Sequence, residues 1–189
     1  RSATFAALLL FTGVPVAPGF FFMAGFMVAL TSIARERRGV PQHEVTRNLI
    51  VRGLVLIAVD AIVMGLPRAL MGFYSFVALS SIGAGLIVLA LVRHAPTRVL
   101  LPAALAVLLL HPLLDVSALP LPLRAILYEP VRSGAFRSLY PVVPWCAIVV
   151  LGFVAGRDAL HRQAPVRRWL TIAGLCLLLF FVVRLAGAY

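Results

Sequence analysis

Long apolar runs with few charges recur along this 189-residue chain. A transmembrane helix needs about 20 mostly apolar residues. Stretches of that kind occupy residues 17–34, 49–66, 73–92, 98–114, 139–156 and 169–188. Hydrophobic residues make up 62% of the chain, against roughly 45–50% in soluble domains. The runs therefore predict an all-α, polytopic transmembrane helix bundle of about six spans, with residues 1–189 forming a single transmembrane domain.

The N-terminal apolar stretch, Thr4–Thr12, is only half a span long. Segment 13–19 follows it and contains two glycines and two prolines, which disfavour a continuous helix. We therefore expect a short N-terminal interfacial or re-entrant helix, followed by a first span that begins at Pro18.

Charge is strongly asymmetric in this chain, which has 17 basic and six acidic residues and a net charge of +11. In a soluble protein this balance would suggest nucleic-acid binding, but in a membrane protein arginines mark the loops retained in the cytoplasm. Ten lie on one predicted side: Arg35, Arg37, Arg38, Arg47, Arg93, Arg98, Arg157, Arg162, Arg167 and Arg168. We expect that side to be cytoplasmic in a multi-pass protein of a bacterial cytoplasmic membrane, whose partner is the lipid bilayer and not a nucleic acid.

The long loop 115–138 lies on the opposite predicted side. Its proline-rich beginning at Leu119 is typical of a turn into a short amphipathic helix lying on the bilayer surface. Tyr128 and Tyr140 would then lie at headgroup depth, where aromatic rings with a polar end are enriched.

Asp60 is an ionisable residue near the middle of the second span, and such residues are costly in lipid. Arg52 lies eight residues earlier on the same helix, about 12 Å away, which is too far for a direct ion pair. Asp60 must therefore meet a partner on another helix, be protonated or face water. Both a packing role and a functional role in a cavity lining remain open.

His111 and Asp115 are spaced i, i+4 at the end of the fourth span. They share a helix face and could touch if the helix continues through Pro112. A carboxylate beside an imidazole is the arrangement of a general base or a metal ligand. The alternative is a histidine at the helix end, with Asp115 in the following turn.

The remaining ligand-type residues do not favour a metal or a haem. Cys146 and Cys176 both lie inside apolar runs, so a zinc site of the usual spacing is excluded. A haem would need a second histidine facing His111, but His43, His94 and His161 fall in the predicted cytoplasmic loops. We expect no metal and no covalently bound cofactor.

The fifth span begins with the segment Tyr140–Trp145, which contains Pro141 and Pro144. Prolines inside a helix free backbone carbonyls that can line a cavity. The segment, including Trp145, is therefore a candidate cavity lip or an ordinary interface anchor. Arg184, five residues from the end of the chain, can extend to the interface along its aliphatic stem.

Several short segments together resemble the membrane domain of the heparan-alpha-glucosaminide N-acetyltransferase-like family. In order, they are Ala17–Gly25 (APGFFFMAG), Val51–Gly53 (VRG), His111–Asp115 (HPLLD), Tyr140–Trp145 (YPVVPW) and Phe181–Arg184 (FVVR). The resemblance implies a membrane acyltransferase bundle and acetyl-CoA as a substrate, with His111 and Asp115 as catalytic candidates.

Family members usually carry an Asp and an Arg-Gly pair on a first helix, and a catalytic His before the Pro-x-Phe span. Neither feature is present, and Val14 stands where many bacterial relatives have histidine. We therefore expect a central portion of a longer family member that is incomplete or non-catalytic by itself.

Three functions from different classes remain. The first is an acyltransferase whose catalytic histidine lies outside the chain and whose cavity is lined by Arg52, Asp60, Pro141, Pro144 and Trp145. The second is a structural transmembrane subunit of a respiratory or photosynthetic complex, for which other membrane subunits or a second copy of the chain are partners. The third is a transporter, suggested by broken helices and buried charges.

Overall fold

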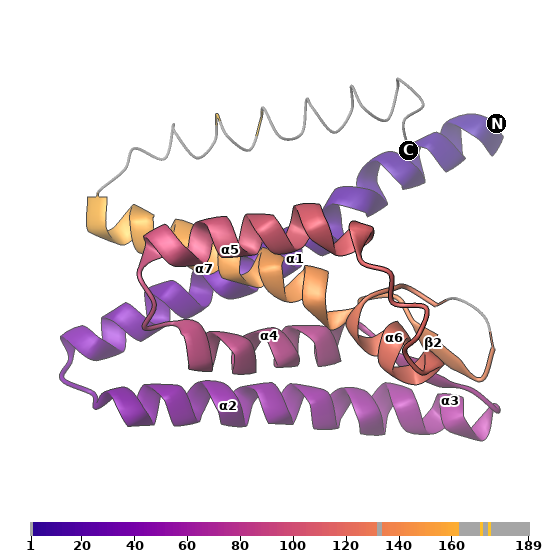
Figure 1. Cartoon of the computed structure of the whole chain (residues 1–189), viewed down its shortest axis with the longest axis horizontal. Helices are drawn as coiled ribbons and strands as arrows, with labels where there is room; N and C mark the ends of the chain where they lie inside the picture. The colour runs from indigo at the N-terminus through magenta and orange to yellow at the C-terminus, as the bar shows by residue number, and fades with distance from the viewer. Residues whose placement is uncertain (1, 132–133, 163–170, 172–173, 175–189) are drawn as a thin grey trace. The chain divides into compact units, whose positions relative to one another are not determined.

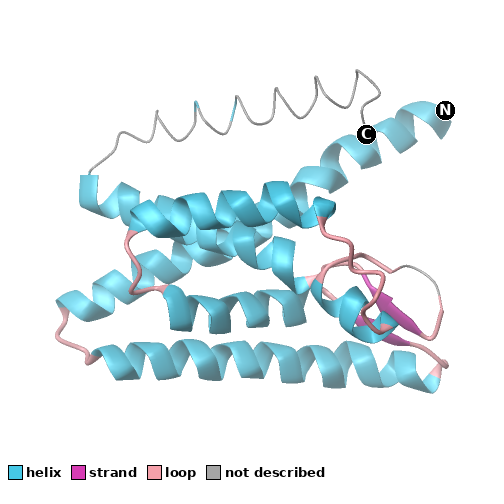
Figure 2. Cartoon of the chain, in the orientation of Figure 1, coloured by secondary structure: helices cyan, strands magenta, loops and turns pink. Residues whose placement is uncertain are grey.

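The computed structural model describes residues 2–131, 134–162, 171 and 174. The chain divides into two compact units, Arg1–Gly156 and Arg157–Tyr189. The elements are α1 (Ser2–Arg37), α2 (Gln42–Val59), a π-helical segment (Asp60–Gly65), α3 (Leu66–Leu70), β1 (Tyr74–Phe76), α4 (Ala78–Val92), α5 (Thr97–Leu110), a 3-10 turn (His111–Leu113), α6 (Leu121–Leu127), β2 (Phe136–Ser138) and α7 (Val142–Arg162) (Figures 1 and 2).

The predicted all-helical class is confirmed, because helices form nearly all of the regular structure in the described residues. Three helical segments there are long and apolar enough to cross a membrane: Val16–Arg37, Gln42–Leu70 and Val142–Leu160. Two further apolar helices, Ala78–Val92 and Thr97–Leu113, are shorter. The sixth predicted span, 169–188, and Arg184 lie outside the described residues.

The predicted break near the N-terminus is wrong, because α1 runs without interruption from Ser2 to Arg37. Pro15 and Pro18 each remove one backbone donor, but the rest of the helical hydrogen bonds survive on either side. A non-helical segment among lipid tails would leave more backbone groups without partners, so an apolar run stays helical through its prolines.

Helix α4 lies beside α2, with backbones in very close approach (Figure 1). A Cβ added to Gly53 of α2 would lie 2.6 Å from the carbonyl oxygen of Gly83 in α4. On another side of α4, a Cβ at Gly85 would meet the Val149 side chain of α7 at 2.9 Å. Small residues allow the helix backbones to approach this closely. Close packing of this kind stabilises helix association in a membrane, where the hydrophobic effect contributes little to it.

Helices α1 and α7 pack through glycines in the same way. A Cβ at Gly25 would collide with the carbonyl of Val149, and one at Gly152 with the carbonyl of Phe22. The apolar core between α1, α4 and α7 contains fully or nearly fully buried side chains, among them Phe21, Leu89, Val149 and Phe153. By contrast, large apolar side chains on the outer sides of α2 and α5 are exposed, as expected for surfaces that contact lipid.

A short parallel pairing of β1 with β2 joins the loop after α3 to the loop before α7. The Tyr74 and Phe136 rings stack across this pair with centroids 5.4 Å apart, and the Arg137 guanidinium lies 4.0 Å from the Phe73 ring centroid. Helix α6 forms where the sequence predicts a short helix in the long loop.

Candidate functional site

Asp60, at the start of the π-helical segment, is only 2% exposed. Its Oδ2 accepts hydrogen bonds from the Ser80 hydroxyl at 2.5 Å, the Ser80 backbone N–H at 3.2 Å and the Val77 backbone N–H at 3.4 Å. Of the alternatives that the sequence left open for Asp60, the structure shows a partner on another helix. Its partner comes from α4, which sequence reasoning did not identify.

This contact caps α4 from a different helix. The residue at the N-cap position of α4 is Val77, whose side chain cannot accept a hydrogen bond. The Asp60 carboxylate takes the place of a capping side chain for the first-turn N–H groups, and its charge complements the positive end of the helix dipole. The other oxygen, Oδ1, is buried and has no hydrogen-bond partner among the described residues.

The beginning of α7 is tied to α4 close to Asp60. Ser81 donates its hydroxyl to the backbone carbonyl of Tyr140. The Trp145 ring lies 4.5 Å from the Phe21 centroid and 5.0 Å from that of Tyr140. These contacts attach the start of α7 to both α1 and α4.

Pro141 and Pro144 are buried at this junction. The sequence suggested that these prolines lie inside the span and free backbone carbonyls, but α7 begins at Val142, so both fall where a backbone N–H has no intrahelical partner. The helix therefore forms without distortion, and the Tyr140 carbonyl is used by Ser81.

His111 and Asp115 are not brought together. Helix α5 ends at Leu110, the chain tightens into the 3-10 turn and Leu114 is extended, so the two residues do not share a helix face. Asp115 is exposed, and its Oδ1 accepts the Ser117 backbone N–H at 3.0 Å. Hydrogen bonds from the Ser117 side chain and backbone lower the pKa of the Asp115 carboxyl. The Asp115 carboxylate therefore stabilises the turn that contains it.

The half-buried His111 has a different orienting group. Its Nδ1 lies 3.1 Å from the Leu108 backbone carbonyl oxygen. A carbonyl can only accept, so in the neutral imidazole this contact places the proton on Nδ1 and the lone pair on Nε2. The imidazole can thus act as a base through Nε2, without a carboxylate behind it.

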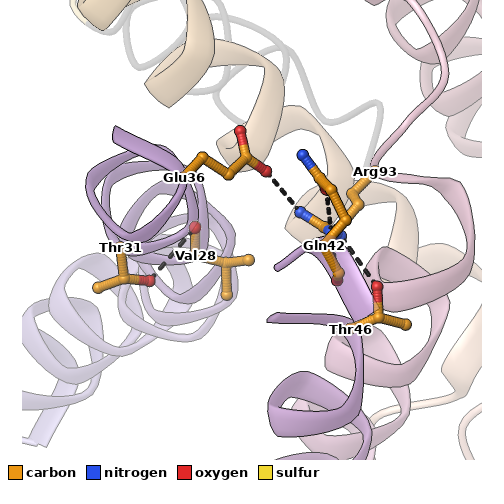
Figure 3. Close-up of polar contacts among 6 residues, drawn as sticks. All are labelled: Val28, Thr31, Glu36, Gln42, Thr46 and Arg93. Carbon is orange, nitrogen blue, oxygen red and sulfur yellow. Dashed lines mark hydrogen bonds and ion pairs between the residues drawn. The ribbon is translucent and has the colours of Figure 1, made fainter. Parts of the chain in front are cut away.

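A second polar centre lies at the other end of α4, around Arg93 (Figure 3). Arg93 is 5% exposed although it directly follows an apolar helix. Its guanidinium donates to the Glu36 carboxylate at 2.8 Å, to Gln42 Oε1 at 2.5 Å and backbone O at 3.0 Å, and to Thr46 Oγ1 at 3.3 Å. One side chain thereby joins the ends of α1, α2 and α4.

The sequence prediction treated Arg93 only as a loop charge that reports topology. A buried arginine is tolerated when a carboxylate neutralises it and its remaining N–H groups find acceptors. Both conditions are met here, but the acceptors come from Glu36, Gln42 and Thr46, which are about 50 residues away in sequence. No local pattern could have revealed the cluster.

Arg52 and Asp60 were predicted to line a cavity, and that remains a prediction. Arg52 is exposed on α2 and lines a pocket between α1 and α2, together with Arg35 and Asn48. Within the described part of the chain, no group of three or more His, Cys, Asp or Glu residues could hold a metal ion.

Comparison with known proteins identifies one family. The family model described as heparan-alpha-glucosaminide N-acetyltransferase, catalytic, matches residues 1–186. No curated protein and no solved structure matches the chain.

Proposed function

Since the chain belongs to the heparan-alpha-glucosaminide N-acetyltransferase catalytic family, we propose that it is the membrane domain of an acyltransferase that moves an acetyl group from acetyl-CoA to an amino sugar. The observation that carries this proposal is the family match over residues 1–186, nearly the full length of the chain. Long apolar helices agree with it, because the acyl donor and the acceptor would meet within a membrane-embedded bundle.

The arrangement of polar groups suggests a direction for the reaction. The Arg93 cluster and Asp60 lie at opposite ends of α4. We place the arginine-rich end in the cytoplasm of a bacterial cell, within a six-span bundle, because arginines are retained there during insertion. The acetyl donor would enter from that end, and the sugar from the end that holds Asp60.

His111 is the proposed base. Its Nε2 would take a proton from the acceptor amine as nitrogen attacks the thioester carbonyl carbon; the carbon–sulfur bond then breaks, and the imidazolium returns that proton to the leaving thiolate. Support comes from the Nδ1 contact with the Leu108 carbonyl, which leaves Nε2 available. The unpartnered Asp60 Oδ1 would accept a hydrogen bond from a donor group of the sugar.

The test of this function uses the complete gene product reconstituted in liposomes, with acetyl-CoA labelled in the acetyl group and a glucosaminide acceptor. His111→Ala should abolish transfer because it removes the proposed base, whereas Asp115→Ala should retain it because Asp115 bonds only within its own turn. Both variants must elute as folded protein. Full activity of His111→Ala would remove His111 from the mechanism.

If the wild-type protein transfers no acetyl group and instead co-purifies at fixed stoichiometry with other membrane subunits, the structural-subunit function replaces the enzyme. This outcome would show that the family fold serves as a scaffold.

The topology behind the proposal is tested by single cysteines placed beside Arg37, Arg98 and Arg124 in a variant without native cysteines. An impermeant thiol reagent added outside intact cells should label only the position beside Arg124. Labelling of all three from outside would contradict the proposed orientation.

A further inference from the structure

A polar pocket lies between α1 and α2 near the end of the bundle that holds Arg93. Its lining residues are Thr31, Ser32 and Arg35 from α1, and Val45, Asn48, Leu49 and Arg52 from α2. In each helix every lining position has another one three or four residues away, so each set occupies one helix face. The pocket is therefore formed by two facing helix surfaces that the tight turn after Arg37 brings together.

The pocket carries uncompensated positive charge. It has two guanidinium groups, from Arg35 and Arg52, and no acidic residue in its lining. In the part of the chain that the structure describes, neither arginine takes part in an ion pair. Glu36, which follows Arg35, is bound to Arg93 on another side of α1. The charge in the pocket thus calls for an anion from outside the chain.

Hydrogen-bond donors in the pocket also outnumber acceptors. The Ser32 side chain is 4% exposed and makes no hydrogen bond within the described residues. Asn48 has an exposed amide with no described partner, whereas the Thr31 hydroxyl is bonded to the backbone oxygens of Met27 and Val28. The Ser32 hydroxyl is not one of the fully buried polar atoms that lack a partner in the described residues, so it is accessible from the pocket and can donate to a bound group. An anion rich in acceptor oxygens would satisfy both Ser32 and the arginines.

The surroundings indicate where that anion comes from. Met27 lies one turn deeper than Thr31 on α1 and is 49% exposed, and Val55 lies one turn deeper than Arg52 on α2 and is 53% exposed. The polar pocket is therefore continuous with an apolar surface of two membrane-length helices. A phospholipid matches this sequence of a polar and then an apolar surface. Its phosphate would lie in the pocket at the helix ends, and its acyl chains would lie along the apolar side chains one turn further into the span.

We propose that this pocket binds the phosphate of an anionic phospholipid, with Arg35 and Arg52 contacting the phosphate and Ser32 and Asn48 donating hydrogen bonds to its headgroup. Basic pockets between transmembrane helices on the cytoplasmic side are the usual form of such sites. The acyl chains lie along Met27 and Val55. This role is separate from the proposed transfer reaction, because Asp60 and His111 do not line the pocket.

The test measures lipid binding to the purified, delipidated full chain in detergent micelles, with short-chain fluorescent phosphatidylglycerol as the probe and phosphatidylcholine as its neutral counterpart. The wild-type chain should bind phosphatidylglycerol more tightly. Arg35→Gln combined with Arg52→Gln should weaken that binding by about thirtyfold, or about fivefold for each arginine, equivalent to about 1 kcal/mol per basic residue near an anionic surface.

A matched double variant, Arg37→Gln with Arg38→Gln, removes the same charge from exposed positions outside the pocket. It should change binding by much less, and both double variants must keep the wild-type unfolding temperature in detergent. An equal loss in the two variants would overturn the site, since the effect would then be general attraction to positive charge.

Inorganic phosphate and coenzyme A serve as soluble competitors that distinguish the source of the phosphate. Neither should displace the lipid probe at concentrations similar to that of the probe, because neither contacts the apolar surface below the pocket. Displacement of the probe by coenzyme A at such concentrations, together with no preference for phosphatidylglycerol over phosphatidylcholine, would overturn the lipid assignment.

Discussion

Replacing Asp60 by Ala should destabilise the bundle through the start of α4. The substitution removes the acceptor of three hydrogen bonds, two from Ser80 and one from Val77. Side-chain hydrogen bonds between membrane helices contribute about 0.6 kcal/mol each on average, so the expected loss is about 2 kcal/mol. This lies at the upper end of the range for loss of a helix N-cap in soluble proteins, about 0.5–2 kcal/mol. The folding equilibrium should shift by about thirtyfold.

The assay is reversible unfolding in mixed micelles, combined with hydrogen exchange of the backbone amides at Val77 and Ser80. Asp60→Asn keeps one oxygen acceptor and loses the charge, so it should retain part of the stability. Asp60→Ala combined with Ser80→Ala should cost less than the sum of the two single changes, because the two side chains share one hydrogen bond.

Asp115→Ala is the matched control, since this carboxylate is exposed and bonds only within its turn. The reasoning fails if Asp60→Ala is as stable as Asp115→Ala. It also fails if the two amides at the start of α4 exchange no faster than in the wild-type protein.

Two further substitutions test the packing around α4. Arg93→Met should cost about 1–3 kcal/mol of unfolding free energy, because it leaves the acceptors of Gln42 and Thr46 without their donor, while the partly exposed Glu36 carboxylate can be solvated. The same change at the exposed Arg98 should cost little, and equal losses at the two positions would contradict the network. Gly53→Ala should cost about 1–3 kcal/mol, because its Cβ would lie 2.6 Å from the Gly83 carbonyl oxygen. Gly19→Ala, where the structure leaves open space, should be neutral in the same assay.

The sequence predicted the candidate site only in part. The cost of a carboxylate in an apolar span was enough to predict that Asp60 finds a polar neighbour. It could not show that the neighbour is Ser80, because the helix that supplies it lies 20 residues further along the chain. The same limit applies to Arg93 and its contacts with Glu36 and Gln42.

The errors have a common physical origin. Spacing alone suggested that His111 and Asp115 share a helix face, but the helix ends first and Asp115 bonds to Ser117. The glycines and prolines before Phe20 suggested a break, yet α1 continues through them. In both cases the sequence pattern indicated what an isolated segment prefers. Where the helix ended or continued depended on which backbone groups had hydrogen-bond partners in the folded chain.

Apolar run length and arginine placement are properties of composition along the chain, so the sequence by itself determined the helical class, the membrane environment and the approximate limits of most helices. It also carried the short motifs by which the family resemblance could be recognised. Tertiary structure decided which polar groups meet. Asp60 caps α4 and Arg93 joins three helix ends because close glycine contacts fix how α4 packs on α2 and α7, and how α7 packs on α1. Arg35 and Arg52 line one pocket because the tight turn after Arg37 brings α1 and α2 together. Such contacts depend on helix rotation and register, which apolar composition leaves open because every face of these helices is compatible with lipid.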